Sequence, residues 1–175
     1  MEVLEATNDP TLQWKTMNAL IHLLRREFIP SAVPAKLGTQ RDRLIKEITG
    51  NSDPYAKRKQ MSNLKAMAVL PVARKFVNRE TSMESRFRKA CVCSIVGNII
   101  EFDIPEHKFE FEDIKKLFKK AEEQLAIDEV SEILELAKKA KQILYLTDNA
   151  GEIAFDTLLV QELKQLGPLV TVAVK

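Results

Sequence analysis

A run of short polar residues near the carboxyl end of the sequence has the residue types and spacing needed to bind a cation. Asp148 and Asn149 follow the apolar run 143–147, and Gly151 and Glu152 come after them with Ala150 between. A strand that leads through such a turn into a helix brings backbone N–H groups and side chains together where α/β proteins bind ligands. Carboxylate and amide oxygens are hard donors, which favour a hard divalent cation over zinc.

The same turn also has a purely structural interpretation. Asp, Asn and Gly are the ordinary residues of a strand-to-helix turn, in which Asp148 would cap the helix. Glu152 falls in the first turn of the expected helix, where a carboxylate interacts favourably with the helix dipole. It could also orient a bound water or a substrate there. The turn by itself leaves both interpretations open.

The elements that must position this turn are predicted from hydrophobic periodicity. Up to residue 139 the apolar residues recur mainly at helical spacing, and from residue 142 the pattern changes to strand, helix and strand over 143–147, 153–166 and 169–174. This order predicts a right-handed βαβ crossover with two parallel strands. We therefore expect an α/β protein with a helical domain over residues 1–140 and the start of an α/β domain over residues 141–175.

Several local features sharpen this expectation. Two strands are too few to form a buried parallel sheet alone, so further strands are expected, and the unpaired edges would permit self-association. Pro71 should kink or divide the helix that begins near residue 54. Trp14 and Phe87 lie at helical spacing among apolar residues and are expected in the core.

Composition excludes several classes of protein. The 175 residues are 45% hydrophobic and 30% charged, and 27 basic against 25 acidic residues give a net charge of +2. Basic and acidic residues alternate along the helices, which argues against a nucleic-acid partner. A long uncharged apolar run is absent from the sequence, so we expect no membrane span and a cytoplasmic location. Cys91 and Cys93 would point to different sides of a helix, which predicts buried thiols and no metal pair.

Four ordered segments resemble a known family. Residues 53–63 read Asp-Pro-Tyr with Lys59 and Asn63 downstream, residues 97–102 read Gly-Asn-Ile-Ile-Glu-Phe, and a strand at 143–147 precedes Asp-Asn-Ala-Gly-Glu at 148–152. These segments are similar to the Asp-Pro-Tyr-x-x-x-Lys-x-x-x-Asn, Gly-Asn-x-x-Asp-Phe and Asp-Asn-x-Gly-Glu motifs of the metal-dependent damage-control phosphatases. That family is ARMT1-like and was long filed as domain of unknown function 89. The resemblance covers nearly the whole chain and is closest to archaeal members.

The resemblance implies a Rossmann-like α/β/α domain with a parallel sheet, and the hydrolysis of phosphate esters of small metabolites, such as sugar phosphates or damaged phospho-metabolites. It implies a divalent cofactor, manganese, cobalt, nickel or magnesium, with Asp148 and Asn149 as metal ligands and Asp148 and Glu152 as catalytic residues. The substrate-binding residues that it implies are Lys59, Asn63, Asn98 and Glu101. For Lys59 and Asn63, which are four residues apart, a solvated helix face is the alternative, and Asn98 could simply end a helix.

Two departures from the family pattern bear on function. Glu101 stands where the family usually has Asp, so the carboxylate is kept on a longer side chain. Family members continue past the second strand with another metal-ligating Asp, so we expect this sequence to correspond to the N-terminal part of a member. The alternative function is a noncatalytic helical interaction module completed by another chain. A nucleotide-binding or methyl-transferring protein is disfavoured, because a Gly-x-Gly-x-x-Gly turn follows neither strand.

Overall fold

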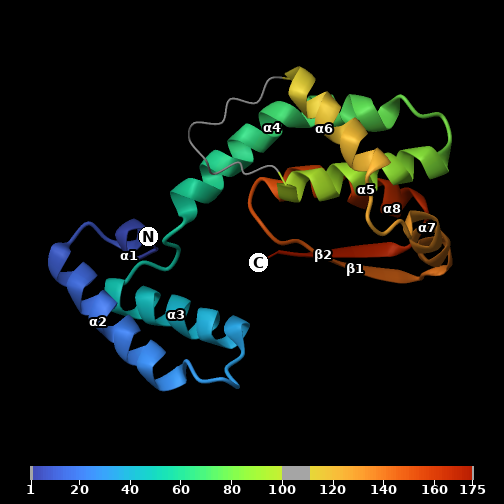
Figure 1. The fold of residues 1–175 in the computed structure, drawn as a ribbon. Helices are drawn as coiled ribbons and strands as arrows, with labels where there is room; N and C mark the ends of the chain where they lie inside the picture. Colours follow the sequence, from blue (N-terminus) through green and yellow to red (C-terminus); the bar gives the residue numbers. More distant parts are fainter. Residues whose placement is uncertain (1, 100–110, 175) are drawn as a thin grey trace. The chain divides into compact units, whose positions relative to one another are not determined.

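The computed structural model describes residues 2–99 and 111–174. Its elements, in chain order, are α1 (Glu2–Ala6), α2 (Pro10–Glu27), α3 (Pro34–Thr49), α4 (Ala56–Asn78), α5 (Met83–Ile99), α6 (Phe111–Glu123), α7 (Val130–Lys139), β1 (Gln142–Leu146), α8 (Glu152–Gln165) and β2 (Leu169–Ala173) (Figure 1). They form two compact units, Met1–Arg58 and Lys59–Lys175. Residue 140, where the sequence suggested a boundary, lies inside the second unit. The division into a helical and an α/β domain stays a prediction.

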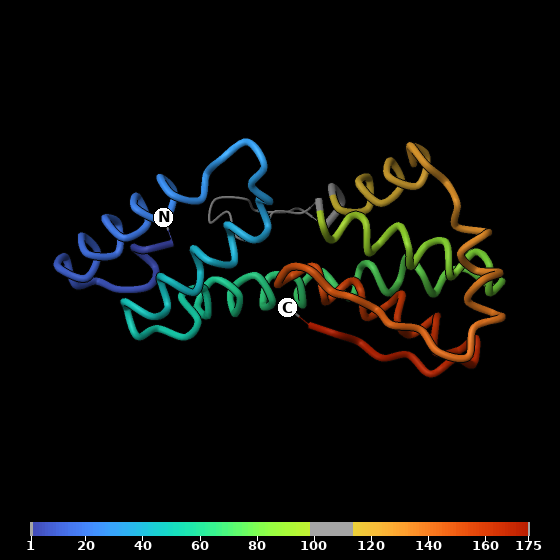
Figure 2. The backbone as a smooth tube through the Cα atoms, turned by 90° about the horizontal axis from the view of Figure 1, so that it is seen from below, coloured from blue at the N-terminus to red at the C-terminus, as the bar shows by residue number. Residues whose placement is uncertain are grey.

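The first unit is helical. Asp9 caps α2 by accepting the Thr11 N–H at 2.8 Å, and Pro10 occupies the first helical position, where a missing N–H costs nothing. Helices α2 and α3 run side by side (Figure 2). Gly50 ends α3 with a left-handed φ of 70°. A small core, centred on Ile45, joins α1 to this pair.

The apolar residues of α2 are less buried than their spacing suggests. Trp14 is 73% exposed, so the prediction that it belongs to the core is wrong. Helical periodicity identifies an apolar face but does not say whether another element covers that face. Phe87 on α5 is 1% exposed, which confirms its predicted place in the core.

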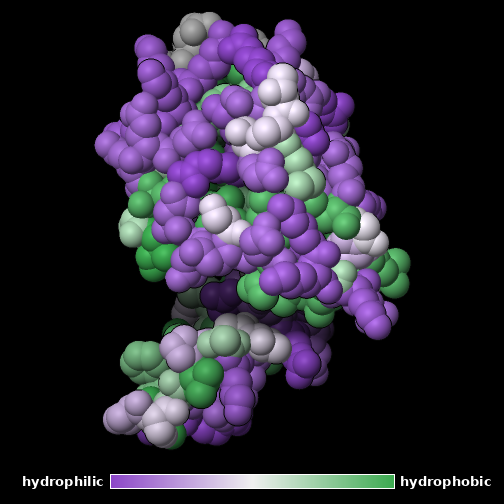
Figure 3. All heavy atoms as spheres, turned by 90° about the vertical axis from the view of Figure 1, so that its right-hand side faces the viewer, coloured by the Kyte–Doolittle hydropathy of each residue, from purple (hydrophilic) through white to green (hydrophobic). Residues whose placement is uncertain are grey.

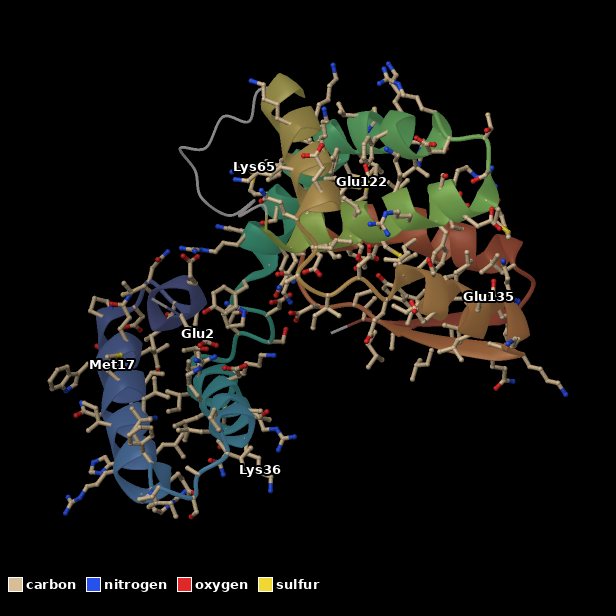
Figure 4. All side chains as sticks on the ribbon, turned by 45° about the vertical axis from the view of Figure 1, so that its right-hand side comes forward. Glu2, Met17, Lys36, Lys65, Glu122 and Glu135 are labelled. Atoms are coloured by element: carbon tan, nitrogen blue, oxygen red, sulfur yellow. The ribbon has the colours of Figure 1, made fainter. Side chains whose placement is uncertain are left out.

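The second unit packs α4, α5, α6 and α8 around one apolar core. The fully buried aromatic residues of this core are Phe118 on α6 and Phe155 on α8. At its rim, Glu122 on α6, labelled in Figure 4, accepts a hydrogen bond from Lys89 on α5 at 3.1 Å. Helix α4 runs through Pro71 without dividing, contrary to one outcome that the sequence suggested.

The sheet of the second unit consists of β1 and β2, which pair in parallel from Gln142 opposite Leu169 to Leu146 opposite Ala173. Its inner face, with Tyr145 at the centre, packs against α5, α7 and α8 (Figure 1). Leu144, Leu146 and Leu169 lie exposed on the other face. The predicted βαβ unit is confirmed, with each strand boundary within one residue of its expected position. The protein is therefore mostly helical with a small parallel sheet.

The surface is largely hydrophilic on the face that Figure 3 shows. Hydrophilic residues cover most of the face shown in Figure 3, and hydrophobic residues form smaller patches on it. Among the residues that the structure describes, no helix has both the length and the apolar character needed to cross a membrane.

Candidate functional site

The candidate site lies where β1 leads into α8. Thr147 fixes the start of the turn, because both its backbone N–H (3.0 Å) and its hydroxyl (3.3 Å) donate to the Ala173 carbonyl of β2. The turn ends at Gly151, whose φ of 88° lies in the region that favours glycine. Glu152 then opens α8. The sequence of the turn thus sets its shape before any partner from another helix is considered.

Side chains of the turn converge on the Glu152 carboxylate. The Asn149 amide nitrogen donates to Asp148 Oδ2 at 3.1 Å and to Glu152 Oε2 at 3.4 Å. From the end of α5, Asn98 donates to the same Glu152 oxygen at 3.0 Å. Glu152 is also in the first turn of α8, where the helix dipole favours a negative charge. Four of the predicted site residues therefore lie together.

Asn63 reaches the same turn from α4. Its side-chain oxygen accepts the Gly151 N–H at 2.7 Å. Gly151 is the N-cap residue of α8, and the backbone N–H groups at the start of a helix have no partner within it. Asn63 therefore caps α8 from another helix and fixes the turn. Its predicted contact with substrate stays a prediction.

Of the two remaining substrate-binding candidates, Lys59 and Glu101, the structure describes only Lys59. Lys59 is exposed on α4, one helical turn before Asn63. Glu101 lies outside the described residues. The predicted contact of Lys59 with substrate therefore stays a prediction.

A glycine that the motif contains has a role that spacing alone did not suggest. A Cβ atom at Gly97 would lie 3.1 Å from the Cβ and Cδ2 atoms of Phe155, which is completely buried. The absence of a side chain lets α5 approach α8 closely at this point. Because Asn98 is the next residue, this approach brings its amide within reach of Glu152. In the sequence, only the Gly97-Asn98 pair indicated this close approach of the two helices.

The donor types fit a hard divalent cation, but they form only part of a ligand set. Asp148 and Glu152 offer carboxylates, and the Asn149 amide, whose nitrogen makes the hydrogen bonds above, offers its oxygen. The described part of the chain holds no group of three or more His, Cys, Asp or Glu side chains that could bind a metal. The turn can therefore supply two or three oxygen ligands.

The two cysteines contribute nothing to this site. Both are buried, as predicted, and burial raises the pKa of each thiol to about 12. They stay protonated near neutral pH, and a protonated thiol is a poor metal ligand.

The chain is similar to proteins of one family. The family model of the damage-control phosphatase ARMT1-like domain matches residues 1–175. A damage-control phosphatase of Archaeoglobus fulgidus is 35% identical over 170 residues, which cover 97% of this chain and 57% of that protein. A damage-control phosphatase of Pyrococcus horikoshii is 30% identical over 162 residues, which cover 92% of this chain and 53% of that protein.

The fold has a counterpart among solved structures. The crystal structure of a DUF89 family protein from Pyrococcus horikoshii matches with a TM-score of 0.78 and 29% sequence identity, over 99% of this chain and 57% of that chain. The chain thus spans little more than half the length of these relatives. Because the family model matches along the whole sequence and the fold agrees, this chain belongs to the ARMT1-like damage-control phosphatase family.

Proposed function

We propose that this chain carries part of the active site of a metal-dependent phosphatase that hydrolyses phosphate esters of small metabolites, such as sugar phosphates or damaged phospho-metabolites. Two relatives are named damage-control phosphatases. The observation that carries the proposal is the convergence of Asp148, Asn149 and Asn98 on Glu152 at the start of α8. If the turn only capped α8, an amide from a second helix, such as that of Asn98, would not be needed at the Glu152 carboxylate.

In this proposal Asp148 and Asn149 hold a divalent cation, which is manganese, cobalt, nickel or magnesium. When bound, the cation polarises a phosphoryl oxygen and lowers the pKa of a coordinated water. The Asp148 carboxylate would supply negative charge to the cation and orient it. Glu152 would orient the attacking water or the substrate, while Asn98 and Asn149 hold the Glu152 carboxylate in place. Such fixed dipoles stabilise the charge that develops on the phosphoryl group.

Substrate binding is assigned to residues around the same turn. We propose that Lys59 and Asn98 provide a cation and an amide for the phosphate, together with Asn63 and Glu101. A phosphate bound near the start of α8 would also be favoured by the helix dipole. The proposed partner is a phosphorylated small molecule in the cytoplasm, with neither nucleic acid nor membrane involved.

The exposed face of the sheet favours a second candidate function. Leu144, Leu146 and Leu169 are 64%, 71% and 64% exposed on the face opposite α8. Exposed apolar sheet faces of this kind are usually covered. A helical interaction module, completed by another chain or by self-association, would use this face. Added strands would extend the sheet to the Rossmann-like α/β/α domain that the family resemblance implies.

Titration of the purified chain with Mn²⁺ by calorimetry, beside p-nitrophenyl phosphate hydrolysis, tests the first candidate. Asp148→Asn should abolish Mn²⁺ binding, whereas Glu132→Gln, an exposed carboxylate change on α7, should leave it unchanged. Equal Mn²⁺ binding by wild type and Asp148→Asn would contradict the phosphatase proposal. Concentration-dependent self-association that Leu146→Lys prevents, without Mn²⁺ binding, would instead favour the interaction module.

A further inference from the structure

A buried polar cluster lies directly behind the candidate site. Asp156 on α8 is 3% exposed, and one of its oxygens, Oδ1, accepts hydrogen bonds from Ser94 on α5 at 2.6 Å and from Tyr145 on β1 at 2.8 Å. The two hydroxyl oxygens are 3.2 Å apart. One carboxylate oxygen thus links three elements, and two of them, β1 and α8, are the elements that the metal-binding turn connects.

The cluster is in register with the site. On α5, Ser94 and Asn98 are four residues apart, and on α8, Glu152 and Asp156 are four residues apart. The Ser94–Asp156 and Asn98–Glu152 hydrogen bonds therefore join the same two helices at neighbouring positions. One helical turn separates them, about 6 Å along the helix axis. A shift of α8 at the Ser94–Asp156 hydrogen bond would also displace the Asn98–Glu152 hydrogen bond.

Burying the Asp156 carboxylate at this position costs folding free energy, which suggests that it has a positioning role. Burying an ionisable side chain is unfavourable, and a well-packed apolar residue often serves stability as well or better. Two hydroxyl donors offset part of this cost and add direction, because hydrogen bonds constrain angles as well as distances. The Tyr145 hydroxyl stays protonated and able to donate, since burial and the nearby Asp156 carboxylate raise its pKa.

We propose that Asp156 is a positioning residue for the metal-binding turn. It fixes the strand before the turn through Tyr145 and the helix after the turn through its own backbone, so that Asp148, Asn149 and Glu152 are held in one geometry. Its effect on metal affinity rests on the proposed function, whereas its effect on the order of the turn does not.

The test compares Asp156→Asn and Tyr145→Phe with Glu162→Gln. Glu162 is the matched control, because it is another buried α8 carboxylate, is paired with Arg86 at 3.3 Å, and lies ten positions beyond Glu152. For each variant, Mn²⁺ affinity, hydrogen exchange of the peptide 147–153 and the melting temperature are measured. Asp156→Asn and Tyr145→Phe should weaken Mn²⁺ binding roughly 10-fold, as is common for residues that hold metal ligands. Exchange at the Gly151 and Glu152 amides should also be faster.

Glu162→Gln should leave both Mn²⁺ affinity and exchange in the turn unchanged, even where its melting temperature falls as much. Equal changes in Glu162→Gln, or wild-type exchange in Asp156→Asn, would overturn the proposal. Should Asp156→Asn fail to fold, Tyr145→Phe and Ser94→Ala give the same decision. Equal Mn²⁺ binding by wild type and Asp148→Asn would defeat the proposed function, and exchange in the turn would still decide whether Asp156 positions it.

Discussion

Asn63 Oδ1 lies 2.7 Å from the backbone nitrogen of Gly151 and accepts its N–H, although the two residues are 88 positions apart in the sequence. Through this bond α4 holds the start of α8 in place. The proposed metal ligands, Asp148 and Asn149, lie three and two residues before Gly151, so their position depends in part on a helix that contributes none of the proposed ligands.

Replacing Asn63 with alanine should therefore destabilise the second unit by about 1 kcal/mol, because the Gly151 N–H loses its partner. Asn63→Asp keeps an acceptor oxygen and should retain most of the stability. Urea unfolding followed by circular dichroism measures both, with Gln60→Ala, an exposed change one turn earlier on α4, as the control. If Asn63→Ala and Gln60→Ala unfold at the same urea concentration, Asn63 does not cap α8.

Gly151→Ala should be more harmful than the loss of its partner. The φ of 88° is poorly accessible to residues with a Cβ, and such strain costs roughly 1–3 kcal/mol. Gly38 is the natural comparison, because it lies inside α3 with open space around its missing Cβ. Gly38→Ala should stabilise its helix by roughly 0.5–1 kcal/mol. Urea unfolding of the two variants should therefore shift in opposite directions, and shifts of the same sign would contradict the assigned backbone conformation.

Much of the fold was predictable from local sequence, and the exceptions share a cause. The strands were located within one residue because an apolar run, a polar turn and a helical pattern are local signals. Division of α4 at Pro71 was not observed, since Leu70 and Ala73 on either side pack into one core, and this packing outweighs one lost backbone hydrogen bond.

The candidate site divides in the same way. Asp148, Asn149 and Glu152 are neighbours in sequence, so spacing alone indicated that they meet. Asn63 and Asn98 reach the turn from other helices, and only the ordered family motifs pointed to them. The Asp156 hydrogen bonds to Ser94 and Tyr145 depend entirely on how α5, β1 and α8 pack, which no local pattern reports.

Alkaline pH should destabilise the second unit through its cysteines. Burial raises the pKa of Cys91 and Cys93 from 9.0 to about 12, so above pH 9 the unfolded chain loses thiol protons that the folded chain keeps. The stabilisation is complete below pH 9 and is lost as the pH rises toward 12, by up to roughly 1.4 kcal/mol per pH unit for each thiol.

Urea unfolding at pH 7, 9 and 10 measures this slope. Cys93→Ala should make the slope clearly shallower, whatever its effect on stability at pH 7. An unchanged slope in Cys93→Ala would show that the Cys93 thiol is not buried in the folded protein. At pH 8 both thiols should also react slowly with a thiol reagent until the protein unfolds, because the thiolate is the reactive form.

Gly97→Ala should disturb the site through packing. The added Cβ would lie 3.1 Å from two atoms of Phe155, and neither helix can yield easily because Phe155 is completely buried. Overpacking of this kind costs about 1–3 kcal/mol. As α5 moves away from α8, the Asn98–Glu152 hydrogen bond should lengthen, and Mn²⁺ affinity should fall together with stability.

The double variant Gly97→Ala with Phe155→Leu separates this clash from a general loss of stability. Phe155→Leu removes ring atoms near the new methyl group, so the double variant should be more stable than the sum of the two single changes predicts, by at least about 0.5 kcal/mol. Mn²⁺ affinity should recover in the same direction, because relief of the clash lets Asn98 return to Glu152. Additive effects on unfolding would mean that the close approach of Gly97 to Phe155 does not determine the spacing of α5 and α8.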